Sequence, residues 1–420
     1  MIRQPPHVAI VTVDPVRIGG MQKFSRFLVS SLLQEGWPVT IALSGLDIYQ
    51  DLAQTGEGRL NVDHVDWIDE TFKGDREYRL DRMIERRRWF RRIRADVAVF
   101  VQSSNTPFRS AVVGAALARV PVVVTHRTMA WPVDIVPSRR HLFGLVPGIG
   151  LHGRRMVART WLTAALASRI VYNSEAVRQG YESLYHYPRR KGIVIPNAVE
   201  MAEQEPASPA DSAAPITVGF VGRISREKRL EILLQAFAGL QCERPVRLLI
   251  CGEGPERPRL ESLGAELGLT DAIEWQPPTH DVNAAYRRID MAVLSSPRES
   301  SSNMVLETLA AGKPAVVTSA GGSPELIGSG QCGIIVPPLD VAALRDALRK
   351  LILDDQLRRQ MGAAGRARAQ TLHDPKAIRN AWLRLLVEVA GRQRGERQCS
   401  CTAQSGTGIP TPAGLEEAIA

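Results

Sequence analysis

Short runs of β-branched and other apolar residues alternate with helical patterns along almost the whole chain. A strand that is apolar on both faces belongs to a parallel sheet with helices on each side, so the alternation predicts an α/β fold. One hydrophobic core rarely extends beyond about 250–300 residues, so a chain of 420 residues is expected to form two domains. The expected strands are 7–13, 38–43, 96–101, 121–125, 169–172, 192–195, 216–221, 246–251, 272–275, 290–294, 314–318 and 333–336. Helices are expected between them, among others at 20–35, 227–240, 255–267, 303–312 and 340–352.

The alternation breaks once, in a stretch from Glu200 to Pro215 that is rich in Ala, Pro, Ser and Glu. This composition is typical of a surface linker between two compact units. We therefore expect two Rossmann-like domains that face each other across a cleft, because ligands bind at the carboxyl ends of the strands in open α/β sheets. The expected boundaries are 1–199 for the N-terminal domain, 200–215 for the linker, 216–375 for the C-terminal domain, 376–392 for a helix that crosses back to the first domain, and 393–420 for a disordered tail.

The formal net charge of +9 favours anionic partners such as phosphorylated substrates, acidic lipid or nucleic acid. Aromatic residues make up only 5% of the chain and do not interleave with basic residues, which argues against nucleic acid. The five cysteines form no C-x-x-C pair, so neither a zinc site nor a disulfide framework is expected. The sequence has no signal-peptide pattern and no run of about 18 apolar residues, which favours a cytoplasmic protein without a membrane span.

A glycine turn with two cations follows the expected strand 216–221. The strand runs into Gly222 and Arg223, and Lys228 precedes the next expected helix. Backbone N–H groups at a helix start attract an anion, and Arg and Lys add positive charge, so the turn is a candidate phosphate site. The alternative interpretation is a basic surface loop.

A second glycine turn follows the strand 246–251 and contains Gly252 and Gly254. It resembles the start of the dinucleotide-binding fingerprint, but that fingerprint requires a third glycine where this chain has Arg257. The turn still allows the backbone to approach a ligand closely. An NAD-dependent oxidoreductase is therefore one alternative function, although the missing glycine argues against it.

Two carboxylates flank the start of an expected helix in the second half of the chain. Ser302 or Asn303 is a favourable N-cap, so Glu299 is expected in the preceding loop and Glu307 about one turn inside the helix. Both can face the crevice at the sheet edge, where carboxylates accept hydrogen bonds from sugar hydroxyls and helix amides bind phosphate oxygens. The alternative interpretation assigns Glu307 to a helix face and Glu299 to a solvated loop.

Five short motifs follow one another along the chain. They are Gly19-Gly20 before a helix, Ile195-Pro196-Asn197-Ala198-Val199, Val221-Gly222-Arg223 with Lys228, Cys251-Gly252-Glu253-Gly254, and Glu299 with Glu307 ahead of Ala310-Ala311-Gly312-Lys313-Pro314. This order is that of the retaining GT-B glycosyltransferases, and the chain resembles glycosyltransferase family 4 from about residue 7 to about residue 390. The resemblance implies the GT-B fold, an N-terminal acceptor domain, and transfer of a sugar from a nucleotide-diphosphate sugar with retention of anomeric configuration.

The resemblance also assigns roles to the charged residues. It implies that Arg223 and Lys228 hold the donor diphosphate and stabilise the leaving group as its charge grows. It implies that Glu299 binds hydroxyls of the donor sugar and that Glu307 binds the nucleoside ribose. No metal ion or other cofactor is expected, because the chain has no Asp-x-Asp triplet and its positive side chains would replace the metal.

The remaining site residues are implied by the same resemblance. His126, at the end of the strand 121–125, matches the histidine that family members place beside the donor sugar. The other donor contacts are expected from backbone close to the ligand, at Gly19, Gly20, Gly252, Ser302, Asn303 and Met304.

Three places in the chain depart from the family pattern. Ser301 and Ser302 stand where the family usually has an aromatic residue and then Gly or Pro, and this change is expected to affect which sugar is preferred. Ala198 replaces the glycine of an Asn-Gly-Val turn, and Gln22 stands near the position of a frequent glutamate.

The main alternative to glycosyl transfer is a nucleotide-sugar epimerase, which has the same two-domain architecture but needs no acceptor. The expected partners are a nucleotide-sugar donor and a glycan or lipid-linked acceptor. The side chains do not identify the donor sugar, the nucleotide base or the acceptor, since base contacts in such folds are made largely by backbone.

Two basic segments favour a peripheral contact with anionic lipid at the inner face of the membrane. In residues 76–94 nine arginines accompany three acids. Apolar residues recur there near helical spacing, at Leu80, Met83, Ile84, Phe90 and Ile93. A second basic segment, 139–159, precedes Trp161. Amphipathic basic segments bind acidic lipid, whereas a solvated helix that packs on the sheet fits the pattern equally well.

Overall fold

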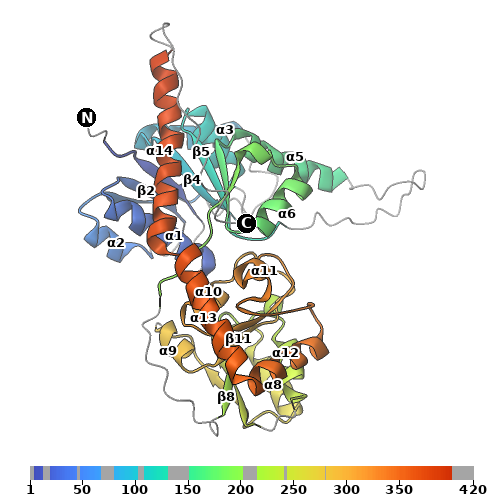
Figure 1. Ribbon diagram of the computed structural model, residues 1–420. Coiled ribbons are helices and arrows are strands. Elements are labelled where there is room, and N and C mark those ends of the chain that lie inside the picture. The colour runs from blue at the N-terminus through green and yellow to red at the C-terminus, as the bar shows by residue number, and fades with distance from the viewer. Residues whose placement is uncertain are drawn as a thin grey trace.

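The computed structural model shows two α/β domains, one above the other in Figure 1, with one parallel sheet in each. It describes residues 4–12, 19–44, 48–67, 80–102, 108–130, 151–201, 215–240, 244–279 and 281–399. The two sheets confirm the predicted pair of Rossmann-like domains.

The sheet of the first domain has seven parallel strands in the order β3-β2-β1-β4-β5-β6-β7. The strands are β1 Val8–Val11, β2 Val39–Leu43, β3 Leu60–His64, β4 Val97–Gln102, β5 Val122–His126, β6 Arg169–Tyr172 and β7 Gly192–Val194. Every residue of β1, β2, β4 and β5 is buried, which agrees with their apolar sequences.

Helices cover both faces of this sheet. On one face lie α3 Leu80–Ile93, α4 Arg109–Leu117, α5 Leu151–Leu166 and α6 Glu175–Tyr185. On the other face lie α1 Gly20–Gln34 and α14 Pro375–Cys399. The shorter elements are α2 Gln50–Thr55 and the 3₁₀ turn η2 Arg189–Lys191.

The sheet of the second domain has six parallel strands in the order β10-β9-β8-β11-β12-β13. The strands are β8 Ile216–Val221, β9 Val246–Cys251, β10 Ile273–Gln276, β11 Met291–Leu294, β12 Ala315–Thr318 and β13 Gly333–Val336. The helices are α7 Leu230–Ala238, α8 Arg257–Glu266, α9 Val282–Arg287, α10 Asn303–Ala310, α11 Ser323–Leu326, α12 Val341–Leu353 and α13 Asp355–Leu372, with 3₁₀ turns η3 Arg226–Lys228 and η4 Gly328–Gly330.

Two expectations about individual elements were wrong. The strand β3 was not predicted, because it lies at the edge of its sheet and exposes Asn61 and His64. An edge strand lacks the continuous apolar run that identified the others. The helix expected at 227–240 is divided into η3 and α7 by Arg229, whose backbone is left-handed with φ +51°.

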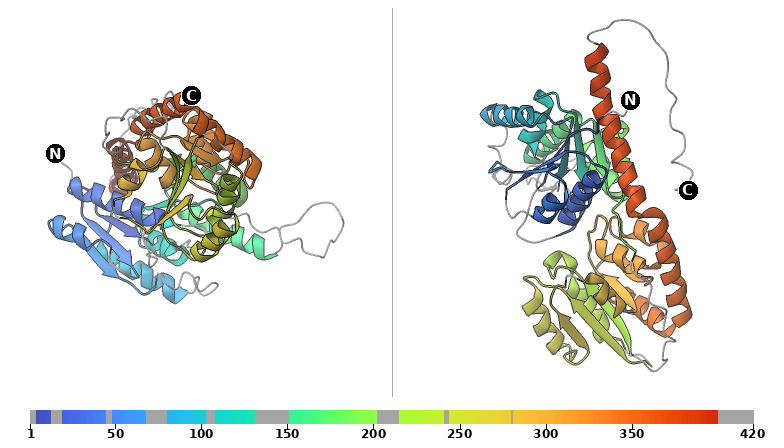
Figure 2. Two further views of the ribbon diagram at one scale, coloured as in Figure 1. Left: turned by 90° about the horizontal axis from the view of Figure 1, so that it is seen from below. Right: turned by 90° about the vertical axis from the view of Figure 1, so that its left-hand side faces the viewer.

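The last helix, α14, leaves the second domain and runs along the first (Figure 2, right). The Trp382 ring lies 5.4 Å from that of Phe24 in α1, and Arg169 Nη2 donates to Glu388 Oε1 at 2.6 Å. The helix extends to Cys399, beyond its expected end at residue 392, so the expected disordered tail is wrong for residues 393–399. The chain therefore connects the two domains at two places, before β8 and before α14.

The helix α3 only partly fits the expected basic and apolar faces. Phe90 is fully buried in the core, and Arg86 is buried with its guanidinium 5.2 Å from the Trp67 ring centroid. Leu80 and Ile84, in contrast, are 69% and 36% exposed. Residues 76–79 and most of the second basic segment lie outside the described residues. Among the helices that the structure describes, none has the length and apolar character needed to cross a bilayer.

Candidate active site

The start of α1, the helix after β1, meets residues that follow β8 and β11 of the second sheet. The first domain presents the start of α1 at Gly19 and Gly20. A Cβ atom on Gly19 would lie 3.7 Å from Arg223 Nη2, and one on Gly20 would lie 3.5 Å from Asn303 Nδ2. The structure therefore brings together four of the predicted donor-site residues from opposite domains.

Two predicted site residues form an ion pair at the centre of this region. Lys228 Nζ lies 2.6 Å from Glu299 Oε2, and their side chains are 22% and 15% exposed. Two serines that follow the neighbouring strand β11 hold the backbone around Lys228. Ser295 Oγ donates to the Lys228 carbonyl at 2.8 Å, and Ser296 Oγ donates to the Glu227 carbonyl at 3.0 Å. The cation expected to bind phosphate and the carboxylate expected to bind sugar are thus adjacent.

Both carboxylate oxygens of Glu307 are also engaged. Tyr286 donates its hydroxyl to Oε2 at 2.8 Å, and Lys23 of the first domain donates to Oε1 at 2.7 Å. Burial and the neighbouring Glu307 carboxylate raise the pKa of Tyr286 well above its usual value, so Tyr286 stays a proton donor. The sequence analysis missed Lys23 and Tyr286, which are far from Glu307 along the chain.

The start of α10 is organised by side chains from both domains. Ser302 is the N-cap, and its hydroxyl accepts from the Val305 N–H at 3.4 Å. Asn303 Oδ1 accepts from Asn197 Nδ2 at 2.9 Å, which ties the helix to the chain crossing. Met304 is buried, and its Sδ accepts from the Val221 N–H at 3.5 Å. These contacts direct the first turn of α10 toward Gly20 of the other domain.

The crossing at Asn197 is held by a buried arginine that the sequence analysis did not identify. Arg127 is 5% exposed, stacks 3.5 Å from the Phe24 ring centroid, and donates to Asn197 Oδ1 at 3.1 Å. Burial lowers its pKa to about 9. His373 Nδ1 lies 2.8 Å from the Asn197 carbonyl oxygen, so the two chain crossings contact each other. Arg127, Asn197 and Asn303 form a continuous link from the first domain to α10.

The side chain of His126 lies inside the first domain. It is 2% exposed and stacks on Tyr181 with ring centroids 3.9 Å apart. Desolvation lowers its pKa to about 3, so the ring is neutral at ordinary pH. The next residue does reach the cleft, since the Arg127 carbonyl accepts from Ser300 Oγ at 2.8 Å. In this arrangement His126 offers a neutral imidazole and not an acid.

The predicted site residue Gly252 packs against the turn that contains Gly222 and Arg223. Its backbone has φ +153°, and a Cβ atom would lie 1.9 Å from the Gly222 carbonyl oxygen. Its N–H donates to the Gln276 carbonyl at 2.9 Å. The glycine is thus required so that two loops can approach each other, which explains a glycine turn without the full dinucleotide fingerprint.

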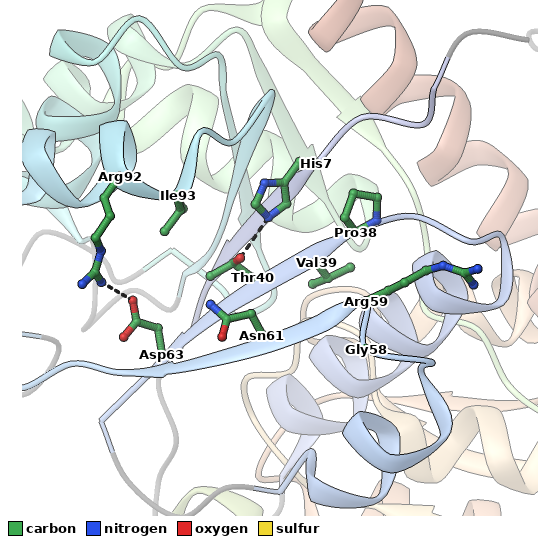
Figure 3. A pocket seen from close by; sticks show the side chains of 10 residues that line it. All are labelled: His7, Pro38, Val39, Thr40, Gly58, Arg59, Asn61, Asp63, Arg92 and Ile93. Atoms are coloured by element: carbon green, nitrogen blue, oxygen red, sulfur yellow. Dashed lines mark hydrogen bonds and ion pairs between the residues drawn. The ribbon is translucent and has the colours of Figure 1, made fainter.

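A cavity of about 610 Å³ lies elsewhere, at the amino ends of β1, β2 and β3 (Figure 3). In it Arg92 Nη2 donates to Asp63 Oδ2 at 2.5 Å, and His7 Nε2 lies 2.9 Å from Thr40 Oγ1. Arg92 is thus paired with Asp63, and His7 with Thr40. Ligands of open α/β sheets bind at the carboxyl ends of the strands, so a donor is expected at the domain boundary and not in this cavity.

Two family models match the chain, one in each half. The family described as Glycosyltransferase Family 4 matches residues 18–203, and the family described as Glycosyl transferases group 1 matches residues 202–368. The two matches meet at the chain crossing between the domains.

Curated relatives match part of the chain. A D-inositol 3-phosphate glycosyltransferase of Corynebacterium urealyticum is 33% identical over 46% of this chain and 50% of its own length. An exopolysaccharide phosphotransferase of Streptomyces coelicolor is 30% identical over 56% of this chain and 25% of its own length. The chain thus spans half or less of the length of these relatives.

Solved structures match nearly the whole chain. The HepE protein of Anabaena in complex with UDP is 18% identical, with a TM-score of 0.71 over 91% of this chain and 100% of its own. Sucrose-phosphate synthase of Thermosynechococcus elongatus is 20% identical, with a TM-score of 0.73 over 93% of this chain and 100% of its own. At this identity the likeness shows the fold. With a glycosyltransferase family model matching each half of that fold, the chain has the GT-B fold and resembles glycosyltransferase family 4.

Proposed function

We propose that this protein transfers a sugar from a nucleotide-diphosphate sugar to a saccharide or lipid-linked acceptor, with retention of anomeric configuration. The observation that carries the proposal is the convergence of Arg223, Lys228, Glu299 and Glu307 with Gly19 at the domain boundary. Cations that face one crevice suit a diphosphate, and paired carboxylates suit the hydroxyls of a sugar and a ribose.

In this proposal Lys228 and Arg223 bind the diphosphate and counter the charge that grows on it as the glycosidic bond breaks. The Lys228–Glu299 pair rearranges when a donor enters, so that Lys228 contacts phosphate and Glu299 accepts from sugar hydroxyls. Glu307 accepts from the ribose, with Tyr286 holding its other oxygen. His126, whose ring is buried among tyrosines of the first domain, is assigned no contact with the sugar and supports this side of the cleft by packing.

The comparisons support a uridine nucleotide as the first donor to test. The HepE structures are described in complex with UDP and with UDP-glucose. A thermal-shift screen of UDP, GDP, ADP and their sugar conjugates should show one base stabilising the protein, since ligand at 100 times its Kd adds about 2.7 kcal/mol. No shift with any nucleotide at saturating concentration would contradict the proposal.

The reaction itself is tested with the sugar nucleotide that binds best. Nucleotide release should depend on an added acceptor, and NMR coupling constants of the product should show the donor's anomeric configuration. Acceptor-independent conversion to an isomeric nucleotide sugar would instead indicate an epimerase, and an inverted linkage would refute retention.

We further propose that the acceptor is met at an anionic membrane surface. Leu80 and Ile84 of α3 are exposed beside Arg88 and Arg91. Trp161 of α5, which like α3 packs on α4, is 47% exposed. Each basic residue near an acidic bilayer contributes about 1 kcal/mol of attraction. The protein should therefore co-sediment with vesicles that contain acidic lipid and lose binding as salt rises.

Charge reversal gives the matched control for this experiment. The double variant Arg88→Glu and Arg91→Glu should lose vesicle binding. The double variant Arg349→Glu and Lys350→Glu, which makes the same charge change on an exposed part of α12, should retain it. Equal binding of wild-type protein to acidic and neutral vesicles, or to neither, would leave a soluble acceptor as the better interpretation.

A further inference from the structure

The side chain of Glu325 belongs to the second domain but completes a helix of the first. Its Oε2 accepts from the N–H of Glu175 at 2.8 Å, and its Oε1 accepts from the N–H of Ala176 at 2.6 Å. These are the first two residues of α6, whose N–H groups have no partner within the helix. The N-cap Ser174 accepts from the third, Val177, at 3.2 Å. The first turn of α6 is thus capped by its own domain and by a carboxylate from the other.

A pair of glycines brings Glu325 into this position. The backbone at Gly321 is left-handed with φ +58°, and a Cβ atom there would lie 1.8 Å from the Glu299 carbonyl oxygen. A Cβ atom on Gly322 would lie 2.9 Å from the Cβ of Ser174. The Gly322 N–H donates to the Glu299 carbonyl at 3.0 Å. The turn therefore sits between the start of α6 and the loop that carries Glu299, with space only for glycine.

Other hydrogen bonds also join the loop that carries Glu299 to the first domain, and these use neutral acceptors. Ser300 Oγ donates to the Arg127 carbonyl at 2.8 Å, and Arg298 Nη2 donates to the Ala130 carbonyl at 2.8 Å. In the Glu325 contact, both oxygens of one carboxylate accept from N–H groups at the positive end of the α6 dipole. A charged acceptor in this position forms a stronger contact than a neutral carbonyl oxygen does. A continuous path runs from α6 through Glu325 and the glycine turn to the backbone of Glu299.

We infer that Glu325 is a positioning residue that docks the first domain, through α6, against the glycine turn and so fixes Glu299 opposite Lys228. This inference rests on the proposed function in one respect, the contact of Glu299 with the donor sugar. On this inference, the Glu299 carboxylate is correctly placed only when the first domain is docked against the second. Binding of the nucleotide part of the donor does not require the contact.

The contact can be removed from either side. Glu325→Gln keeps the shape of the side chain but removes its charge and one accepting oxygen. Glu175→Pro removes the N–H that donates to Glu325, and proline is tolerated there because Glu175 is the first residue of α6 and Ser174 is extended. Glu175→Ala is the matched control, since it removes the same side chain but keeps the N–H.

Both test variants should lower kcat about tenfold and leave the Kd for UDP within twofold of wild type. Small-angle scattering should show a larger radius of gyration for both variants than for Glu175→Ala and wild type. Unchanged kcat and radius in a folded test variant would overturn the inference, as would a loss of thermal stability with an unchanged radius. If wild-type protein transfers no sugar, the proposed function fails, and the scattering comparison still decides whether Glu325 holds the domains together.

Discussion

The two domains contribute to the cleft in different ways. The second domain supplies charged side chains from short segments of sequence, such as Arg223 and Lys228 within one turn. The first domain supplies mainly backbone and buried rings, with Gly19 close to Arg223 and His126 enclosed by tyrosines. The charged groups of the candidate site are therefore encoded in short segments of sequence, whereas the first domain meets them through contacts between residues far apart in the chain.

The strongest challenge to this comparison is removal of a charge from the second domain. Lys228→Ala should lower turnover at least 100-fold while the protein remains folded, because a lost charge-assisted hydrogen bond costs about 1.5–3 kcal/mol and more where charge develops. Arg226→Ala is the control, since Arg226 is exposed in the same turn and should keep turnover within twofold. Near-normal turnover of an Arg223→Ala, Lys228→Ala double variant would show that the phosphates bind elsewhere.

Substitution of Glu299 should chiefly affect catalysis, and substitution of Glu307 should chiefly affect nucleotide binding. Glu299→Gln should lower kcat about 10- to 100-fold and change nucleotide affinity less, because sugar contacts are only part of ground-state binding. Glu307→Ala should chiefly weaken binding of UDP, measured by calorimetry. If the two variants showed each other's effects, the assignment of sugar and ribose would have to be exchanged.

The smallest expected effect concerns the buried histidine of the first domain. Desolvation lowers the pKa of His126 from 6.5 to about 3, so between these values the unfolded chain binds a proton that the folded chain does not. The free energy of unfolding is therefore unaffected by His126 above pH 6.5 and falls as the pH drops below it, by about 1.4 kcal/mol at pH 5.5.

Urea denaturation at pH 7.5 and pH 5.5 measures this loss. In His126→Phe, the free energy of unfolding should change less between the two pH values than in wild type. The control His64→Gln, at an exposed position of β3, should show the same change as wild type. An unchanged pH dependence in His126→Phe would mean that the ring is hydrated or charged in the folded protein, and that the first domain is more polar at this point than the structure indicates.

Much of the fold could be predicted because most strands are covered on both faces and therefore consist of apolar runs. The edge strand β3, with the sequence from Leu60 to His64, has one protected side and a polar composition, so the same criterion failed. The break at Arg229 was missed for a different reason. A left-handed backbone at a non-glycine residue leaves no clear mark in composition.

The candidate site divides in the same way. Arg223, Lys228, Glu299 and Glu307 could be predicted because each stands next to a strand end or a helix start that the sequence marks. The contacts between the domains could not be predicted, since Lys23 lies 284 residues from Glu307 and Glu325 lies 150 residues from Glu175. Such pairs are determined by how the two domains pack, and no local pattern carries that information.

Hydrogen–deuterium exchange with the nucleoside diphosphate that stabilises the protein most tests the central claim directly. The claim is that the donor binds at the carboxyl ends of the second sheet, against the first domain. At saturating ligand, the amides of residues 222–228 and 302–307 should gain protection, while those lining the cavity near His7 and Arg59 should not change. Protection confined to that cavity, or absent from both donor segments, would contradict the account.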